Sequence, residues 1–300
     1  MSQSFYGVLT AMITPFKDGN VDWAGLNSFA EWQIEEGVQG LVAVGTTGES
    51  PTLSHEEHLQ VIESVVNTAD GRVPVIAGTG SNSTREAVRL TKRAHDASVD
   101  AMLVVTPYYN KPNQEGLFQH FSSIADNTDK PIILYSIPSR CVIEVGIDTL
   151  VRLRGKYPHV NSIKESGGSC DRVCEIRQAL GDSMTILSGD DSLTLPFISV
   201  GAKGVVSVAS NLMPEPVAHM VGAALNNDLQ TASSLNEALY PLFVNLFKEP
   251  SPAPVKAAML AAGLIDSDVV RGPLCTVGDE TRSLLKNTVE DLNAKLTAWA

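Results

Sequence analysis

The chain has 300 residues, of which 43% are hydrophobic, and a formal net charge of −12. The length allows a large buried core, while the acidic charge without any basic stripe argues against a nucleic-acid partner. No apolar run reaches the roughly 18 residues of a membrane helix. Residues 1–5 lack the basic and apolar regions of a secretory signal. We therefore expect a cytoplasmic protein that binds neither nucleic acid nor a membrane.

Short β-rich runs alternate with amphipathic segments along most of the chain. Several of the runs are continuous in Val, Ile and Leu, which is typical of parallel strands covered by helices on both sides. The expected strands are residues 7–13, 40–45, 74–78, 101–106, 131–136, 161–165, 184–188 and 204–209. Helices are expected at residues 23–36, 55–68, 84–97, 114–127 and 171–180.

Eight strands that alternate with helices indicate an α/β fold with right-handed parallel crossovers. A closed (β/α)8 TIM barrel is the economical arrangement, and a doubly wound open sheet is the alternative. After about residue 213 only helices are expected, at 214–226, 229–247, 254–262 and 279–298. The pattern predicts a catalytic barrel over residues 1–226, followed by a small C-terminal helical extension over residues 227–300.

Lys164 stands out among the polar residues at the expected strand ends. In barrels of this type the active site lies at the carboxyl ends of the strands, and strand side chains point alternately inward and outward. An inward lysine is shielded from water, which favours its neutral amine and makes it a nucleophile toward a carbonyl. Position alone also fits a lysine that reaches solvent from a strand end. Glu165 must point the opposite way and is not an obvious ion-pair partner.

Three hydroxyl side chains could move protons around such an amine. Tyr135 ends the neighbouring expected strand, and Thr47 and Tyr109 follow two others. Tyr135 could exchange a proton with the imine carbon, Thr47 could pass it on, and Tyr109 could connect the relay to solvent. Each hydroxyl taken singly is as easily a satisfied structural group. Their joint occurrence with Lys164 at strand ends favours a catalytic set.

The turn at residues 45–48 and Arg140 are candidate anion sites. The turn offers backbone N–H groups and the hydroxyls of Thr46 and Thr47, which suit a carboxylate. Asp190 and Asp191 oppose a phosphate at the strand end where many barrels bind one. Arg140 could hold a second carboxylate in bidentate geometry or could be a surface arginine.

No metal site is expected. The four cysteines form no CxxC pair, and Cys170 and Cys174, four residues apart on a helix, lack a third ligand nearby. We expect free, buried thiols. Ser54 and Glu57 form a capping-box pattern at a helix start, and His55, His58 and Glu86 are expected on helix faces.

Several of these segments together resemble the dihydrodipicolinate synthase family, within the wider superfamily of pyruvate-dependent aldolases. The resemblance extends in order and spacing over nearly the whole chain. It rests on GTTGES (45–50), TPYYNKP (106–112), YSIPSR (135–140), IKES (163–166), SGDD (188–191), GAKGVVSV (201–208) and KEPSPAPVKAAM (248–259).

The resemblance implies an enzyme that condenses pyruvate with L-aspartate 4-semialdehyde, in the diaminopimelate route to L-lysine. Lys164 would form the Schiff base, with Thr47, Tyr135 and Tyr109 as the proton relay and no metal or organic cofactor. Tyr109 would reach into a neighbouring subunit of a homotetramer, a dimer of dimers. Substrate binding would fall to Thr46 and Thr47 for the pyruvate carboxylate, Arg140 for the semialdehyde carboxylate, and Gly189 and Val206 through backbone groups.

Two departures and one regulatory hypothesis accompany the resemblance. Ser136 stands where the family usually has Asn, and Cys141 where Thr is common, in the stretch expected to face the second substrate. Feedback inhibition by L-lysine is a hypothesis that rests on residues matching the lysine-binding positions of sensitive family members. These are Ser50, His55, His58, Asn82, Glu86 and Tyr108.

Two other functions remain open at this point. A related pyruvate aldolase acting on a 2-keto-3-deoxy sugar acid or N-acetylneuraminate would use the same lysine with a different aldehyde. Arg140 argues against it, because a sugar aldehyde carries no α-carboxylate for it to hold. A non-catalytic barrel that senses a keto acid or amino acid would have no need of the intact set of Lys164, Tyr135, Thr47 and Tyr109.

Overall fold

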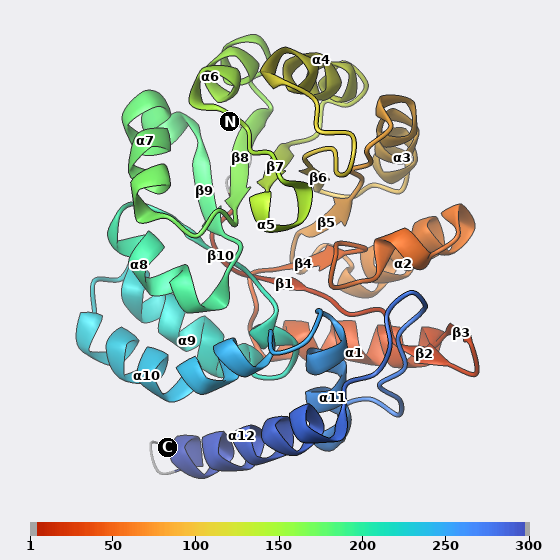
Figure 1. Cartoon of the computed structure of the whole chain (residues 1–300), viewed down its shortest axis with the longest axis vertical. Coiled ribbons are helices and arrows are strands. Elements are labelled where there is room, and N and C mark those ends of the chain that lie inside the picture. The colour runs from red at the N-terminus through yellow and green to blue at the C-terminus, as the bar shows by residue number, and fades with distance from the viewer. Residues whose placement is uncertain (1–4, 298–300) are drawn as a thin grey trace.

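The computed structural model describes residues 5–297 and contains a closed eight-stranded parallel barrel inside a ring of helices (Figure 1). The prediction of a (β/α)8 barrel is confirmed. Around the barrel the hydrogen-bonded order is β1-β10-β9-β8-β7-β6-β5-β4, closing on β1. The barrel strands are β1 (Gly7–Ala11), β4 (Gly40–Ala43), β5 (Val75–Gly78), β6 (Ala101–Val105), β7 (Ile132–Ser136), β8 (Val160–Glu165), β9 (Thr185–Ser188) and β10 (Gly204–Ser207).

The helices around the barrel follow its strands in chain order. They are α1 (Trp23–Glu35), α2 (His55–Ala69), α3 (Thr84–Asp96), α4 (Gln114–Ala125), α5 (Pro138–Cys141), α6 (Ile147–Lys156), α7 (Cys170–Leu180), α8 (Thr194–Ser199) and α9 (Pro214–Leu225). Short 3-10 turns are η1 (Ser50–Thr52), η2 (Gly181–Ser183), η3 (Asp191–Leu193) and η4 (Ala209–Asn211). Side-chain caps mark several helix starts, and the capping box of Ser54 and Glu57 is present at α2.

Some elements differ from the sequence expectation. A small antiparallel hairpin, β2 (Phe16–Lys17) with β3 (Asn20–Val21), lies before α1 and was not expected. The first and last barrel strands are shorter than predicted because side chains capture backbone N–H groups just beyond them. Asn211 accepts from Ile13 at 3.0 Å, and Asp191 accepts from Val208 and Ala209 at 3.0 Å each. Their ladders therefore stop at Ala11 and Ser207.

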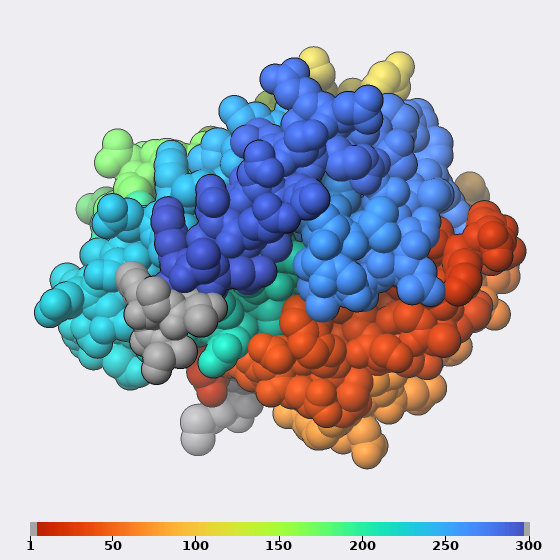
Figure 2. All heavy atoms as spheres, turned by 90° about the horizontal axis from the view of Figure 1, so that it is seen from below, coloured from red at the N-terminus to blue at the C-terminus, as the bar shows by residue number. Residues whose placement is uncertain are grey.

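The three helices that follow α9 in the chain lie along one side of the barrel and are coloured cyan to blue in Figure 1. They are α10 (Leu229–Asn245), α11 (Ala253–Ala261) and α12 (Asp279–Thr297). Residue 298, the last of the final predicted helix, lies outside the described residues. In the view from below, the C-terminal part of the chain, in blue, lies against the N-terminal part, in red (Figure 2). The boundary at residues 226 and 227 remains a prediction, although α9 ends at Leu225.

The core has two layers, as strand alternation requires. One cluster contains Leu9, Val42, Ile133 and Leu187 and fills the barrel. The other contains their strand neighbours together with the buried helix residues, and it lies between barrel and helices. Among residues 5–297, none of the helices is long and apolar enough to cross a membrane.

Candidate active site

Lys164 points into the barrel. Its strand neighbour Ile163 belongs to the outer cluster, and its register partners Tyr135 and Leu187 belong to the inner one. The side chains of Lys164 and Tyr135 are only 6% and 5% exposed, and Lys164 Nζ lies 4.1 Å from the centre of the Tyr135 ring. The alternative of a lysine that reaches solvent is wrong. The lysine is an amine inside a packed barrel, beside a phenol.

Glu165 faces the opposite way, as its position next to Lys164 predicts. Its carboxylate is fully buried, accepts a 2.7 Å hydrogen bond from the Gly167 N–H, and lies 3.6 Å from Arg172 Nε. Arg172 also donates to the Val145 carbonyl. Burial raises the pKa of Glu165 to about 7, against the opposing charge of Arg172. The carboxylate thus serves the packing outside the barrel and does not pair with Lys164.

The end of β9 packs directly against the lysine. The Gly189 N–H donates to the Glu165 carbonyl at 2.8 Å. A Cβ atom on Gly189 would lie 1.8 Å from Ser166 Oγ and 3.0 Å from Lys164 Cε. A side chain at this position would force Ser166 and Lys164 to shift, so the backbone of Gly189 borders Lys164 at close range.

Asp191 is committed to structure. Its carboxylate is fully buried and accepts from the Ser207 hydroxyl at 2.5 Å and from the Val208 and Ala209 N–H groups. Burial raises its pKa, and these hydrogen bonds oppose the rise. The neighbouring Asp190 also has a pKa raised by burial, which the charge of Lys164 opposes. The buried carboxyl of Asp191 and the half-buried carboxyl of Asp190 disfavour a phosphate ligand, and Asp191 fixes the end of β10 just beyond Val206.

The turn after β4 carries Thr46 and Thr47. Thr46 lines a cavity of about 430 Å³ and Thr47 is buried. The turn is closed by a hydrogen bond from the Glu49 N–H to the Thr46 carbonyl at 3.1 Å, and the Thr14 hydroxyl donates to the Gly48 carbonyl at 2.7 Å. This geometry holds two hydroxyls at the carboxyl end of a barrel strand.

The same cavity reaches Tyr135, Arg140 and Cys141. Arg140 is exposed on α5, and within residues 5–297 its guanidinium has neither a hydrogen bond nor an ion pair. Cys141 is buried, and burial raises the pKa of its thiol. Ser136 does not face the cavity: it is in register with Glu165 on the outer side and is fully buried. Of the two departures, only Cys141 lines the cavity, so the expectation is wrong for Ser136 and stays a prediction for Cys141.

The structure does not assemble the whole proposed relay within one chain. Tyr109 is 90% exposed on the loop after β6 and does not line the cavity. In the part of the chain that the structure describes, no hydrogen bond joins the hydroxyls of Tyr135, Thr47 and Tyr109. A single chain thus brings Lys164 and Tyr135 together and leaves Tyr109 pointing outward.

Five of the six residues of the lysine hypothesis line the same cavity as Thr46 and Arg140. Ser50, His55, His58, Glu86 and Tyr108 line it. His58 Nε2 donates to the Gly78 carbonyl at 2.9 Å, and burial lowers its pKa to about 4, so the ring is neutral at pH 7.

Glu86 is already engaged on both oxygens. Ser81 donates to Oε2 at 2.6 Å, while Oε1 lies 3.3 Å from His55 Nε2 and 3.7 Å from Arg89 Nη2. Arg89 also lies 2.7 Å from His55 Nε2, which requires that ring nitrogen to accept. Sequence reasoning missed Arg89, although its place three residues after Glu86 on a helix was a usable signal.

Asn82, the sixth residue of the lysine hypothesis, does not line the cavity. Its backbone carbonyl accepts a hydrogen bond of 2.8 Å from the side-chain amide of Asn110.

The four cysteines are free. Cys141 is buried, but Cys174 and Cys275 are exposed and Cys170 is half-buried, so the expectation of buried thiols is wrong for these three. Among the described residues, no group of three or more His, Cys, Asp or Glu side chains could hold a metal ion.

Known proteins are similar to this chain over nearly its whole length. The family model described as the dihydrodipicolinate synthetase family matches residues 4–292. The chain is 45% identical over 292 residues to the 4-hydroxy-tetrahydrodipicolinate synthase of Aquifex aeolicus (strain VF5), covering 97% of this chain and 99% of that one.

Two solved structures are similar over almost the full length. The chloride-inhibited dihydrodipicolinate synthase from Acinetobacter baumannii, complexed with pyruvate, is 44% identical with a TM-score of 0.93, over 97% of this chain and 99% of that one. The enzyme from Cyanidioschyzon merolae with lysine bound is 35% identical with a TM-score of 0.92, over 96% and 98%.

Proposed function

This chain belongs to the dihydrodipicolinate synthetase family, and from that premise we propose how its residues condense pyruvate with L-aspartate 4-semialdehyde. The product is 4-hydroxy-tetrahydrodipicolinate, and the reaction is the first committed step of the diaminopimelate route to L-lysine. The observation that carries the assignment of Lys164 is its place inside the barrel, 4.1 Å from the Tyr135 ring.

The chemistry begins at the Lys164 amine. It attacks the keto carbon of pyruvate, and loss of water leaves an imine. Removal of a methyl proton gives an enamine, whose carbon attacks the aldehyde carbon of the second substrate. The amine of that substrate then displaces Lys164 from the imine, closing the ring and regenerating the free lysine. The protonated imine serves as electron sink, so the mechanism needs no metal or organic cofactor.

Tyr135 is the proton carrier nearest to the reacting carbon, because its ring borders Lys164. Thr47 passes the proton on, and Tyr109 of a neighbouring subunit completes the relay. The 90% exposure of Tyr109 in a single chain supports this arrangement, because a catalytic phenol needs a partner surface to exclude water. The sharing of Tyr109 between subunits fits a homotetramer built as a dimer of dimers. We place this enzyme in the cytoplasm.

Pyruvate and L-aspartate 4-semialdehyde each carry a carboxylate, and each carboxylate needs its own binding site. Thr46 and Thr47 receive the pyruvate carboxylate through hydroxyls and turn N–H groups, and Gly189 and Val206 border the pocket through their backbones. Arg140, which has no partner among the described side chains, holds the carboxylate of the semialdehyde at the same cavity. A sugar aldehyde offers no such carboxylate, so the aldolase alternative leaves Arg140 without a ligand.

L-lysine is proposed as a feedback inhibitor that binds beside Glu86 in the cavity. The carboxylate of Glu86 suits an ammonium group, and His55 and His58 flank it. Half-inhibition at or below millimolar lysine is expected in a steady-state assay. Full activity in several millimolar lysine would contradict the proposal.

The reaction is tested with purified protein and pyruvate, supplied in parallel with L-aspartate 4-semialdehyde, N-acetylmannosamine and glyceraldehyde. We expect turnover with the semialdehyde alone. Borohydride reduction with pyruvate should add one reduced pyruvate unit to Lys164, as read by mass spectrometry, and Lys164→Ala should abolish both signals while remaining folded. Turnover with a sugar aldehyde would overturn the assignment of the second substrate and of Arg140.

A further inference from the structure

A buried ion pair joins the C-terminal helices to the turn after β4. Lys256 on α11 donates from Nζ to Glu49 Oε1 at 2.5 Å, and the two side chains are 0% and 1% exposed. The ammonium also donates to the Val269 carbonyl at 2.9 Å and lies 4.2 Å from the centre of the Phe16 ring. A charge buried this deeply is tolerated only when it is paired, so each partner depends on the other.

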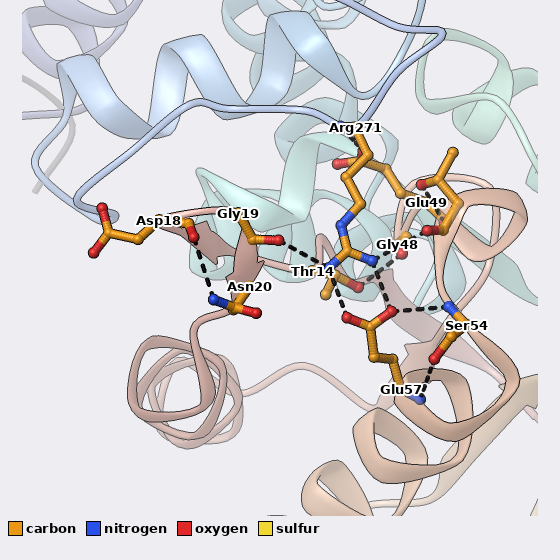
Figure 3. Close-up of polar contacts among 10 residues, drawn as sticks. Thr14, Asp18, Gly19, Asn20, Gly48, Glu49, Ser54, Glu57 and Arg271 are labelled. Atoms are coloured by element: carbon orange, nitrogen blue, oxygen red, sulfur yellow. Dashed lines mark hydrogen bonds and ion pairs between the residues drawn. The ribbon is translucent and has the colours of Figure 1, made fainter.

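Arg271 extends the connection to the start of α2. Its backbone N–H donates to Glu49 Oε2 at 2.8 Å, so both carboxylate oxygens of Glu49 are held from the C-terminal side. Its guanidinium grips Glu57 through two hydrogen bonds of 2.6 and 2.7 Å and donates to the Thr52 carbonyl (Figure 3). Residues of the C-terminal region therefore hold the segment 49–57 at several points.

The turn held in this way has strained backbone at both ends. Glu49 has a φ of 56° and the β-branched Val44 a φ of 49°, both in the left-handed region that such residues rarely adopt. Strain of this kind persists only where the surroundings over-determine it, and it gathers at functional sites. Thr46 and Thr47 lie between the two strained residues. The backbone conformation of Glu49 therefore bears directly on where the two hydroxyls lie.

We propose that Lys256 and Arg271 act through Glu49 to position the Thr46–Thr47 turn for the carboxylate of pyruvate. The C-terminal region is then part of what sets pyruvate affinity, although neither cation touches the substrate. This inference rests on the proposed role of the turn. Arg140, which is proposed to hold the second substrate, lies on α5 and has no bond to this network. The network should therefore affect one substrate and spare the other.

The test uses the full-length double variant Glu49→Gln/Lys256→Met, which removes both buried charges together. Steady-state KM for pyruvate, KM for L-aspartate 4-semialdehyde and kcat are measured, with the pyruvate dependence of borohydride trapping at Lys164. We expect KM for pyruvate to rise roughly tenfold, as release of backbone strain predicts. KM for the semialdehyde should stay within about twofold, and kcat at saturating pyruvate should change less than KM for pyruvate.

A matched control neutralises an ion pair of the same length elsewhere. Glu31 on α1 and Arg72 in the loop after α2 pair at 2.5 Å, and both side chains are 40–43% exposed. Glu31→Gln/Arg72→Met should leave both KM values unchanged. If the first double variant fails to fold, Glu49→Asp keeps the charge pair but shortens the side chain, and the same selective rise in KM for pyruvate is expected.

Two outcomes would overturn the inference. One is a folded variant with unchanged KM for pyruvate, and the other is an equal rise of both KM values, which would indicate general loosening. Failure of the proposed function is seen separately in the wild-type protein, which would then either trap no pyruvate on Lys164 or trap it without turning over L-aspartate 4-semialdehyde.

Discussion

Replacing Gly189 with alanine tests the packing around the proposed nucleophile. The added methyl group would lie 1.8 Å from Ser166 Oγ and 3.0 Å from Lys164 Cε. Ser166 is buried, and its hydroxyl has no hydrogen-bond partner among the described residues, so it can rotate at small cost. Lys164 Cε is next to the reacting nitrogen and must yield as well. The substitution leaves the backbone groups of Gly189 in place, so its effect is steric.

The expected loss follows from those distances. Overpacking a well-packed site costs about 1–3 kcal/mol. At about 1.4 kcal/mol per factor of ten, the same strain carried into the transition state lowers kcat/KM roughly 5- to 140-fold. Displacement of a nucleophile by about 1 Å has a similar effect on rate. Gly189→Ala should therefore form the trapped pyruvate adduct slowly while it remains folded.

The assay compares kcat/KM and the rate of borohydride trapping in Gly189→Ala, Ser166→Ala and the double variant. Ser166→Ala alone should be near wild type, and in the double variant it should recover part of the lost rate by removing the 1.8 Å contact. Gly222→Ala is the matched control, since nothing lies within 4 Å of its added Cβ. Wild-type trapping in folded Gly189→Ala would refute the reasoning.

Three further predictions concern charge. Burial raises the native pKa of Glu165 to about 7 from 4.5, so its contribution to stability is present below pH 4.5 and lost as pH rises through about 7. The free energy of unfolding of the wild-type protein should decline by about 3 kcal/mol between pH 5 and 8 because of this group, and Glu165→Gln should lack that decline. Parallel Tm profiles for the two proteins would contradict this. Arg89→Ala should lower the lysine concentration for half-inhibition about two- to fivefold, because Glu86 loses an exposed competing cation. A weaker lysine response would instead place Arg89 among the groups that bind lysine. Arg271→Met should lower the free energy of unfolding by about 2 kcal/mol in urea titrations at pH 7, because Glu57 loses two charge-assisted hydrogen bonds. An unchanged midpoint would show that Arg271 does not support the start of α2.

Local patterns determined much of this protein. All eight barrel strands and the C-terminal run of helices could be predicted from the sequence. A short apolar run predicts a strand covered on both sides, and an amphipathic segment predicts a helix with one buried face. The opposite directions of Lys164 and Glu165 followed from the two-residue period of a strand, whereas only the structure decided that Lys164 is the one that points inward. Motifs at strand ends supplied the remaining candidates, since barrel geometry brings strand ends to one face.

Tertiary structure alone decided the contacts between distant segments. Lys256 and Glu49 are 207 residues apart, and no local pattern marks either as the partner of the other. Burial of Cys170, Cys174 and Cys275 differed from expectation because a short polarizable side chain fits a core or a surface equally well. Ser136 was expected to face the substrate because of its neighbours in sequence, yet its strand register turns it outward beside Glu165. Sequence periodicity specifies which face of each element is buried, whereas the folding of the whole chain determines which buried groups contact one another.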